Sequence, residues 1–155
     1  MSVGALRRRL EASRRALLEA VRGLTEQAFM SELPPSVSEP STEQGATTVV
    51  AYLAALAPAE REAVRLAREA VGAEQRPLPP ATAREQVLPP QLIHDLAGAR
   101  HETLLFLDTL DALDTLDEPR PRAQSGELSV QELLEAVADR ESAAARRLAE
   151  RPANN

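Results

Sequence analysis

The stretch that decides the fold is residues 126–148, GELSVQELLEAVADRESAAARRL. Ser129 and Glu132 form a capping box, in which each side chain accepts a hydrogen bond from the other residue's backbone amide, so a helix is predicted to begin here. The apolar residues that follow recur with the three-four spacing of a buried helix face, and Glu141 falls on that same face. A buried carboxylate needs a partner. The apolar members of the face are Val130, Leu133, Leu134, Val137, Ala144, Ala145 and Leu148.

Three further helical segments are predicted upstream. They are Val3–Gln27, a segment that begins between Ser41 and Thr47 and continues to Val71, and Pro90–Leu113. Pro58 lacks a backbone donor and should kink or restart the second segment. Proline-bearing stretches at 31–40, 72–90 and 118–125 separate the segments, so long connections are expected between the helices.

A second charged residue, Arg100, falls at a position that the helical pattern predicts to be buried. It falls in the middle of the apolar stripe of the third segment, whose inward members are predicted to be Ile93, Leu96, Ala97, Leu104 and Leu107. Arg100 is therefore the natural partner of Glu141. Glu60 also approaches an apolar phase, but a glutamate shortly after Pro58 is explained by a helix N-terminus, where it faces the backbone amides. In the first segment, Leu6, Leu10, Leu17, Val21 and Leu24 are predicted to point inward, and an alternating-charge stripe is predicted to face solvent.

The closing helix is similar to that of the DinB/YfiT-like superfamily of four-helix-bundle metalloenzymes, on the pattern Ser129-Val130-Gln131-Glu132-Leu133-Leu134 followed by an alanine-rich face. The resemblance extends over nearly the whole chain in element order and loop placement. In that family two histidines four apart on the last helix join a third from the second helix to bind a divalent metal. These positions fall on Arg140, Ala144 and Tyr52, so the chain resembles a divergent member that lacks the metal-binding histidines.

The two histidines of the chain do not replace that site. His94 and His101 are seven residues apart, about 10.5 Å along a helix axis, which is too far for one metal ion bound from one helix face. His101-Glu102 also lacks the second histidine of a zinc-binding H-E-x-x-H motif. The sequence therefore predicts no metal and no cofactor, and both histidines are expected to border the core or face solvent.

Composition narrows the function classes. A length of 155 residues with 43% apolar residues is enough for one domain over residues 1–155 with a real core. The absence of cysteine excludes disulfides and thiolate chemistry, and the absence of lysine excludes Schiff-base chemistry. A net charge of −6 argues against a nucleic-acid partner, and no apolar run reaches membrane-spanning length, so no membrane partner is expected either.

The sequence thus predicts an all-α protein, a four-helix bundle with long crossover connections. The resemblance implies a cytoplasmic protein that forms a homodimer. We favour a non-catalytic protein that binds a small molecule or a protein partner in or near the former metal cleft. One alternative is a thiol-dependent transferase, isomerase or hydrolase-like enzyme that uses Tyr52, Arg100, Arg140 and Glu141, with arginine binding an oxyanion and glutamate acting as base. The other alternative is a purely structural homodimer.

Overall fold

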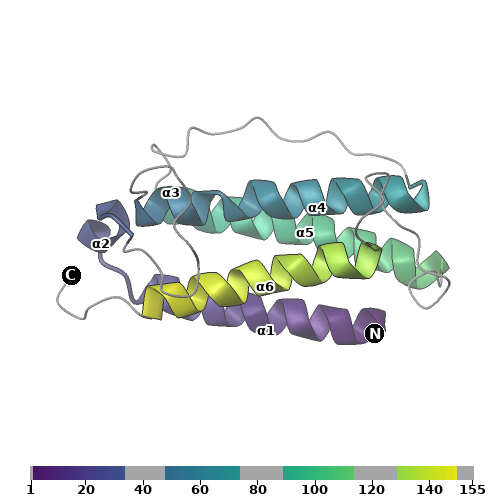
Figure 1. The fold of residues 1–155 in the computed structure, drawn as a ribbon, viewed down its shortest axis with the longest axis horizontal. Coiled ribbons are helices and arrows are strands. Elements are labelled where there is room, and N and C mark those ends of the chain that lie inside the picture. The colour runs from purple at the N-terminus through teal and green to yellow at the C-terminus, as the bar shows by residue number, and fades with distance from the viewer. Residues whose placement is uncertain (1, 34–47, 74–88, 114–128, 150–155) are drawn as a thin grey trace.

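The chain is all-α in every part that the structure describes. A computed structural model of the protein describes residues 2–33, 48–73, 89–113 and 129–149. The helices are α1 (Val3–Arg22), α2 (Glu26–Met30), α3 (Val49–Ala54), α4 (Leu56–Val71), α5 (Pro89–Leu113) and α6 (Val130–Ala149). They form a bundle in which α3 and α4 follow one another nearly end to end (Figure 1). None of these helices combines the length and the apolar character that crossing a membrane requires.

The long helices pack side by side around one interior. Helix α1 lies along α6, α6 lies along α4, and α4 lies along α5. The remaining side of the bundle, between α1 and α5, is packed less extensively. Long side chains are therefore needed to connect α1 with α5.

Side-chain caps fix where several helices begin. Ser2, Thr25 and Thr48 each accept a hydrogen bond from the backbone amide three residues ahead, and so they cap α1, α2 and α3. The predicted capping box of α6 is confirmed: the Glu132 amide donates to Ser129 at 3.2 Å, and the Ser129 amide donates to the Glu132 carboxylate at 3.3 Å. These hydrogen bonds satisfy amides that have no partner within the helix.

A polar layer divides the core into two apolar halves. One half is built around Leu6, Leu10, Phe106 and Leu134, and the other around Leu17, Leu53, Leu96, Ala144 and Leu148. Along α1 the break between the halves falls at residues 13–14, and along α6 it falls at Glu141. Glu60, Arg100 and Glu141 therefore lie at the middle of the core, whereas Arg68, the other buried charge among the described residues, lies over the ring of Phe106.

The first predicted segment is wrong at its C-terminal end. Helix α1 ends at Arg22, and Thr25 caps a separate short helix, α2, so Val3–Gln27 is not one helix. The physical reason is local, because Gly23 weakens the helix and the Thr25 hydroxyl accepts from the Ala28 amide at 3.1 Å. The inward set of α1 is confirmed for Leu6, Leu10, Leu17 and Val21, whereas Leu24 is only half-buried and lies beyond the helix.

The second predicted segment is broken, as Pro58 suggested. Helix α3 ends at Ala54 and α4 restarts at Leu56, which places Pro58 in the first turn of α4, where a missing amide costs no helical hydrogen bond. The described start of α3 is Val49 with Thr48 as its cap. The predicted start between Ser41 and Thr47 lies outside the described residues. So do residues 118–125 and most of 31–40 and 72–90, the predicted long connections.

Helix α5 begins at Pro89 and reaches Leu113, close to the predicted bounds, but its buried face was predicted partly wrong. Ile93 is 40% exposed and Ala97 is exposed, whereas Leu96 and Leu107 are buried as predicted and Leu104 is half-buried. The helix carries apolar residues on both faces, so periodicity alone could not fix its rotation. The buried face also includes Leu92, Ala99, Thr103, Phe106 and Leu110.

Candidate functional site

Four long helices each place one charged side chain in the polar layer. Arg14 comes from α1, Glu60 from α4, Arg100 from α5 and Glu141 from α6, and together we call them the charged cluster. Each residue lies in line with buried apolar neighbours on its own helix, such as Leu10 and Leu17 on α1. The helix packing that buries those neighbours also brings the four charges together.

Arg100 connects α5, its own helix, to three other helices. Its Nε donates to both carboxylate oxygens of Glu60, at 3.1 and 3.3 Å, and one Nη donates to Glu141. Its other Nη donates to the backbone carbonyl of Leu10 in α1 at 2.9 Å. The pairing of Arg100 with Glu141, which the sequence predicted, is confirmed.

Arg14 repeats this pattern from the neighbouring helix α1. It donates through Nε to Glu141 and through one Nη to Glu60 at 3.3 Å. Its other Nη donates to the carbonyl of Leu96 in α5 at 2.9 Å. Arg14 and Arg100 thus each bind both glutamates and a carbonyl on the other's helix, which closes the loosely packed side between α1 and α5.

Ser13 completes the set of donors. Its hydroxyl oxygen lies 2.8 Å from a Glu141 oxygen and 3.0 Å from the Leu10 carbonyl. Because a hydroxyl has one proton, it can donate to only one of these acceptors at a time. Glu141 therefore accepts from two guanidinium groups and, in part, from a hydroxyl.

The charged cluster is buried and electrically balanced. The glutamate side chains are 2–3% exposed and the arginine side chains 11–12%, and two positive charges meet two negative ones. Burial raises the pKa of Glu60, and the positive charges of Arg100 and Arg14 oppose that rise. Charges this deep are tolerated because every one of them is paired and hydrogen-bonded.

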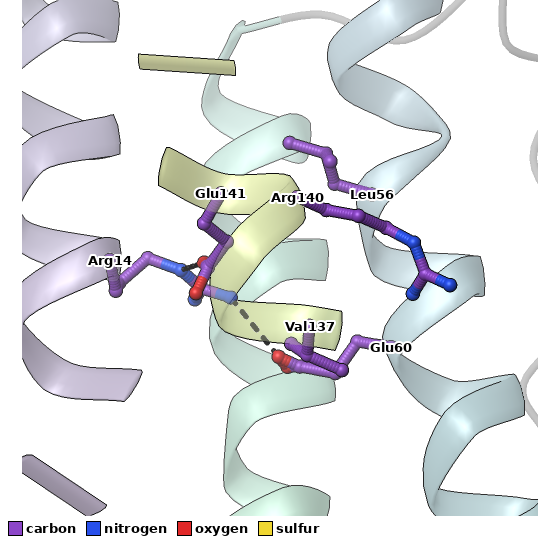
Figure 2. Close-up of a pocket in the computed structure, with 6 residues that line it drawn as sticks. All are labelled: Arg14, Leu56, Glu60, Val137, Arg140 and Glu141. Atoms are coloured by element: carbon purple, nitrogen blue, oxygen red, sulfur yellow. Dashed lines mark hydrogen bonds and ion pairs between the residues drawn. The ribbon is translucent and has the colours of Figure 1, made fainter. Parts of the chain in front are cut away.

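The charged cluster has no room for a substrate. A cavity of about 10 Å³ lies beside it, lined by Arg14, Leu56, Glu60, Val137, Arg140 and Glu141 (Figure 2). This volume corresponds to about one water molecule. The two carboxylates thus face guanidinium groups and border open volume for about one water molecule.

A larger hollow opens on the surface next to the charged cluster. It has a volume of about 410 Å³ and lies between α3, the start of α4 and α6. Its lining consists of Tyr52, Ala55, Leu56, Ala59, Asp139, Arg140 and Ala143. Figure 2 shows the guanidinium of Arg140 directed away from Arg14 and Glu141, toward α4. Leu56 and Arg140 line both spaces, so the hollow and the small cavity are neighbours.

Neighbouring ion pairs set the charge of this hollow. Asp139 at its rim forms an ion pair with Arg9 of α1, and Arg9 also lies 3.6 Å from Glu135. Arg147 lies over the ring of Tyr52, with its guanidinium carbon 4.9 Å from the ring centroid. Arg140 is exposed and makes no hydrogen bond or ion pair within the described parts of the chain. The hollow therefore presents one uncompensated positive charge above an apolar floor.

The four candidate residues from the sequence divide into two pairs. Arg100 and Glu141 meet inside the charged cluster, whereas Tyr52 and Arg140 line the surface hollow. Of the positions that the DinB-like resemblance assigns to metal ligands, Ala144 is buried in the apolar core and the other two line the hollow. His94 and His101 are both exposed. Among the described residues, no three histidine, cysteine, aspartate or glutamate side chains are grouped so that they could hold a metal ion.

Sequence reasoning missed two members of the charged cluster. Arg14 follows Ser13 in the gap between the buried Leu10 and Leu17, and a polar pair in that gap was the available signal. Glu60 was attributed to a helix N-terminus, which is wrong. Helix α4 begins at Leu56, so Glu60 lies beyond its first three positions, and its carboxylate binds Arg100 and Arg14 in place of backbone amides.

Comparisons with protein-family models, with curated proteins and with solved structures give no match for this chain. The fold and the two neighbouring sites are therefore the basis for a functional proposal.

Proposed function

We propose that this protein is a non-catalytic helical-bundle protein, a metal-free relative of the DinB-like proteins, that binds a small molecule in the surface hollow between α3–α4 and α6. The observation that carries the proposal is the hollow itself. It has about 410 Å³ of open volume, an apolar floor and an arginine, Arg140, that has no hydrogen-bond or ion-pair partner among the described residues. Ligand sites of small molecules are of this size and combine an apolar lining with a few polar groups.

The division of the candidate residues favours binding over catalysis. An enzyme that used Tyr52, Arg100, Arg140 and Glu141 together would need all four to face one substrate. Arg100 and Glu141 are instead paired with each other inside the charged cluster, where only about 10 Å³ is open. Glu141 accepts from Arg14, Arg100 and Ser13 and does not line the hollow, so its carboxylate is not placed to take a proton from a molecule bound there.

The charged cluster has a structural role in this proposal. Its side chains connect α1, α4, α5 and α6 at one level of the bundle and so fix how the helices are placed relative to one another. Buried polar groups that are satisfied only in one arrangement disfavour alternative packings.

The test is a titration of labelled protein with octan-1-ol, octanoate and octylamine, followed by amide chemical shifts. The proposal expects at least one probe to shift the amides of Ala55, Ala59 and Ala143. Ala143→Phe, which fills the hollow, should abolish this binding, whereas Ala12→Phe on the exposed face of α1 should not. Absence of binding by all three probes to the folded wild type would overturn the proposal.

Homodimer formation is a separate proposal that rests on the small apolar residues of the long helices and on the DinB-like resemblance. A molar mass measured by light scattering at micromolar concentration tests it. A monomer mass throughout would rule it out without affecting the hollow.

A further inference from the structure

We infer that the ligand of the surface hollow is a small amphipathic monoanion, a carboxylate carried on a hydrocarbon body. This inference rests on the proposed binding function and specifies the chemistry of the ligand. It depends on three features of the hollow: its apolar floor, the state of its two charged residues, and the electrical neutrality of the charged cluster beside it.

The floor selects for hydrocarbon. Ala55, Leu56, Ala59 and Ala143 provide only methyl and isobutyl groups to a bound molecule. Covering such a surface is favourable by about 25 cal/mol for each Å² removed from water. The ring of Tyr52 adds a flat apolar wall to the hollow, and the guanidinium of Arg147 lies over that ring.

The two charged residues of the hollow are not equivalent. Asp139 is ion-paired with Arg9 of α1, which also lies 3.6 Å from Glu135. Arg140, the next residue along α6, makes no ion pair within the described residues. Arg140 is therefore the charged lining residue that is available to an anion, since the carboxylate of Asp139 already has a guanidinium partner.

The charged cluster adds no net charge beside the hollow. Its two arginines and two glutamates sum to zero charge, so the interior beside the hollow contributes no net attraction or repulsion. One uncompensated guanidinium matches one negative charge. A guanidinium also presents two parallel N–H groups that fit the two oxygens of a carboxylate.

The ligand is expected to carry a single negative charge, because the hollow offers one unpaired positive charge. A dianionic headgroup such as a phosphate monoester would leave one negative charge unmatched near Asp139 and Glu135. A cationic headgroup would face Arg140 directly. The hollow thus favours a carboxylate over an alcohol, an amine and a dianion that carry the same hydrocarbon chain.

The experiment compares octanoate, octan-1-ol, octylamine and octyl phosphate as dianion, each titrated against the wild type and two variants. Arg140→Gln removes the proposed anion-binding charge. Arg146→Gln, an exposed arginine of the same helix that does not line the hollow, is the matched control. We expect octanoate to bind most tightly and to lose about tenfold in affinity in Arg140→Gln, as loss of one charge-assisted hydrogen-bonded contact predicts.

Further outcomes separate this inference from the proposed function. Octan-1-ol should bind Arg140→Gln and wild type equally, and Arg146→Gln should keep wild-type affinity for octanoate. Binding of octan-1-ol, octylamine or octyl phosphate as tight as that of octanoate, or an octanoate affinity indifferent to Arg140→Gln, would overturn the ligand class and leave the hollow as a binding site. If none of the four probes bound, both the ligand class and the proposed function would be wrong.

Discussion

Arg140 and Glu141 are consecutive residues of α6, and they lie in opposite environments. Glu141 is 2% exposed and accepts from two arginines and a serine that belong to other helices. Arg140 is exposed and lines the surface hollow, and its guanidinium points away from Arg14 and Glu141 (Figure 2). One step along a helix turns the side chain by about 100°, which is enough to move a charge from the interior to the surface.

The difference shows how a charge can serve the fold or a ligand, but not both. A buried charge is stable only when its hydrogen-bonding capacity is used within the protein, and this leaves nothing to offer a ligand. An exposed charge keeps its hydration and its capacity until a ligand replaces the water. The charged cluster should therefore dominate stability, and Arg140 should dominate binding.

The largest expected effect is the loss of one member of the charged cluster. Arg100→Leu and Glu141→Leu should each lower the free energy of unfolding by about 3–5 kcal/mol, because each leaves an uncompensated charge in the interior. The double variant leaves Arg14 opposite Glu60, whose charges cancel, so it should recover much of the loss. Urea denaturation of the three variants gives the coupling energy directly.

Small, strictly additive losses in these three variants would contradict the charged cluster. Such a result would mean that the two charges do not meet and that both behave as ordinary surface residues on rotated helices. Leucine is the appropriate replacement because it fills the interior volume, which separates the electrostatic effect from that of a cavity.

A smaller effect is expected for the hydroxyl that supports Glu141. Ser13→Ala should lower the free energy of unfolding by about 1 kcal/mol, since Glu141 keeps both arginine donors. In the Glu141→Leu background the same substitution should have almost no further effect, because the acceptor is gone. A full effect in that background would show that the hydroxyl matters only through its hydrogen bond to Leu10.

The pH dependence of the free energy of unfolding tests the environment of Glu60 separately. Because burial raises the pKa of Glu60 above its ordinary value of 4.5, the folded state holds this proton more tightly than the unfolded state. The contribution of Glu60 to stability should therefore fall as the pH rises from about 4.5 through the raised pKa, and stay constant above it. The measurement is the pH dependence of the unfolding free energy for wild type minus Glu60→Gln. An increase of this difference with pH would mean that the arginines outweigh burial and lower the pKa.

The smallest expected effect on stability is at the surface. Arg140→Gln should change the free energy of unfolding by less than about 0.5 kcal/mol, because the side chain is exposed and makes no internal ion pair within the described residues. Thermal and urea denaturation beside the Arg146→Gln control measure it. A loss similar to that of Glu141→Leu would place Arg140 among the structural charges.

The pairing of Arg100 with Glu141 could be predicted from the sequence, because both charges interrupt otherwise apolar faces of long helices. Arg14 and Glu60 obey the same rule. Arg14 was overlooked beside the many solvent-facing charges of α1, and Glu60 was misassigned because Pro58 suggested a helix start too late in the chain. The apolar pattern of a helix thus identifies buried charges when its true start is known.

The surface hollow could not be predicted from the sequence. Tyr52 and Arg140 lie on helices far apart in the chain, and the hollow depends on how α3 and the start of α4 are placed against α6. Small residues at Ala55, Ala59 and Ala143 create open volume only because they face one another. A resemblance to the DinB-like pattern singled out Tyr52 and Arg140, but helix packing decides that they line one space.

The most direct test of the separation between fold and binding is an octanoate titration of the Arg100→Leu/Glu141→Leu double variant, followed by calorimetry beside the wild type. The charged cluster contributes no net charge to the hollow, and neither substituted residue lines it. We expect a folded double variant that binds octanoate with wild-type affinity. A folded double variant that had lost octanoate binding would contradict it, since the buried charges would then belong to the binding site.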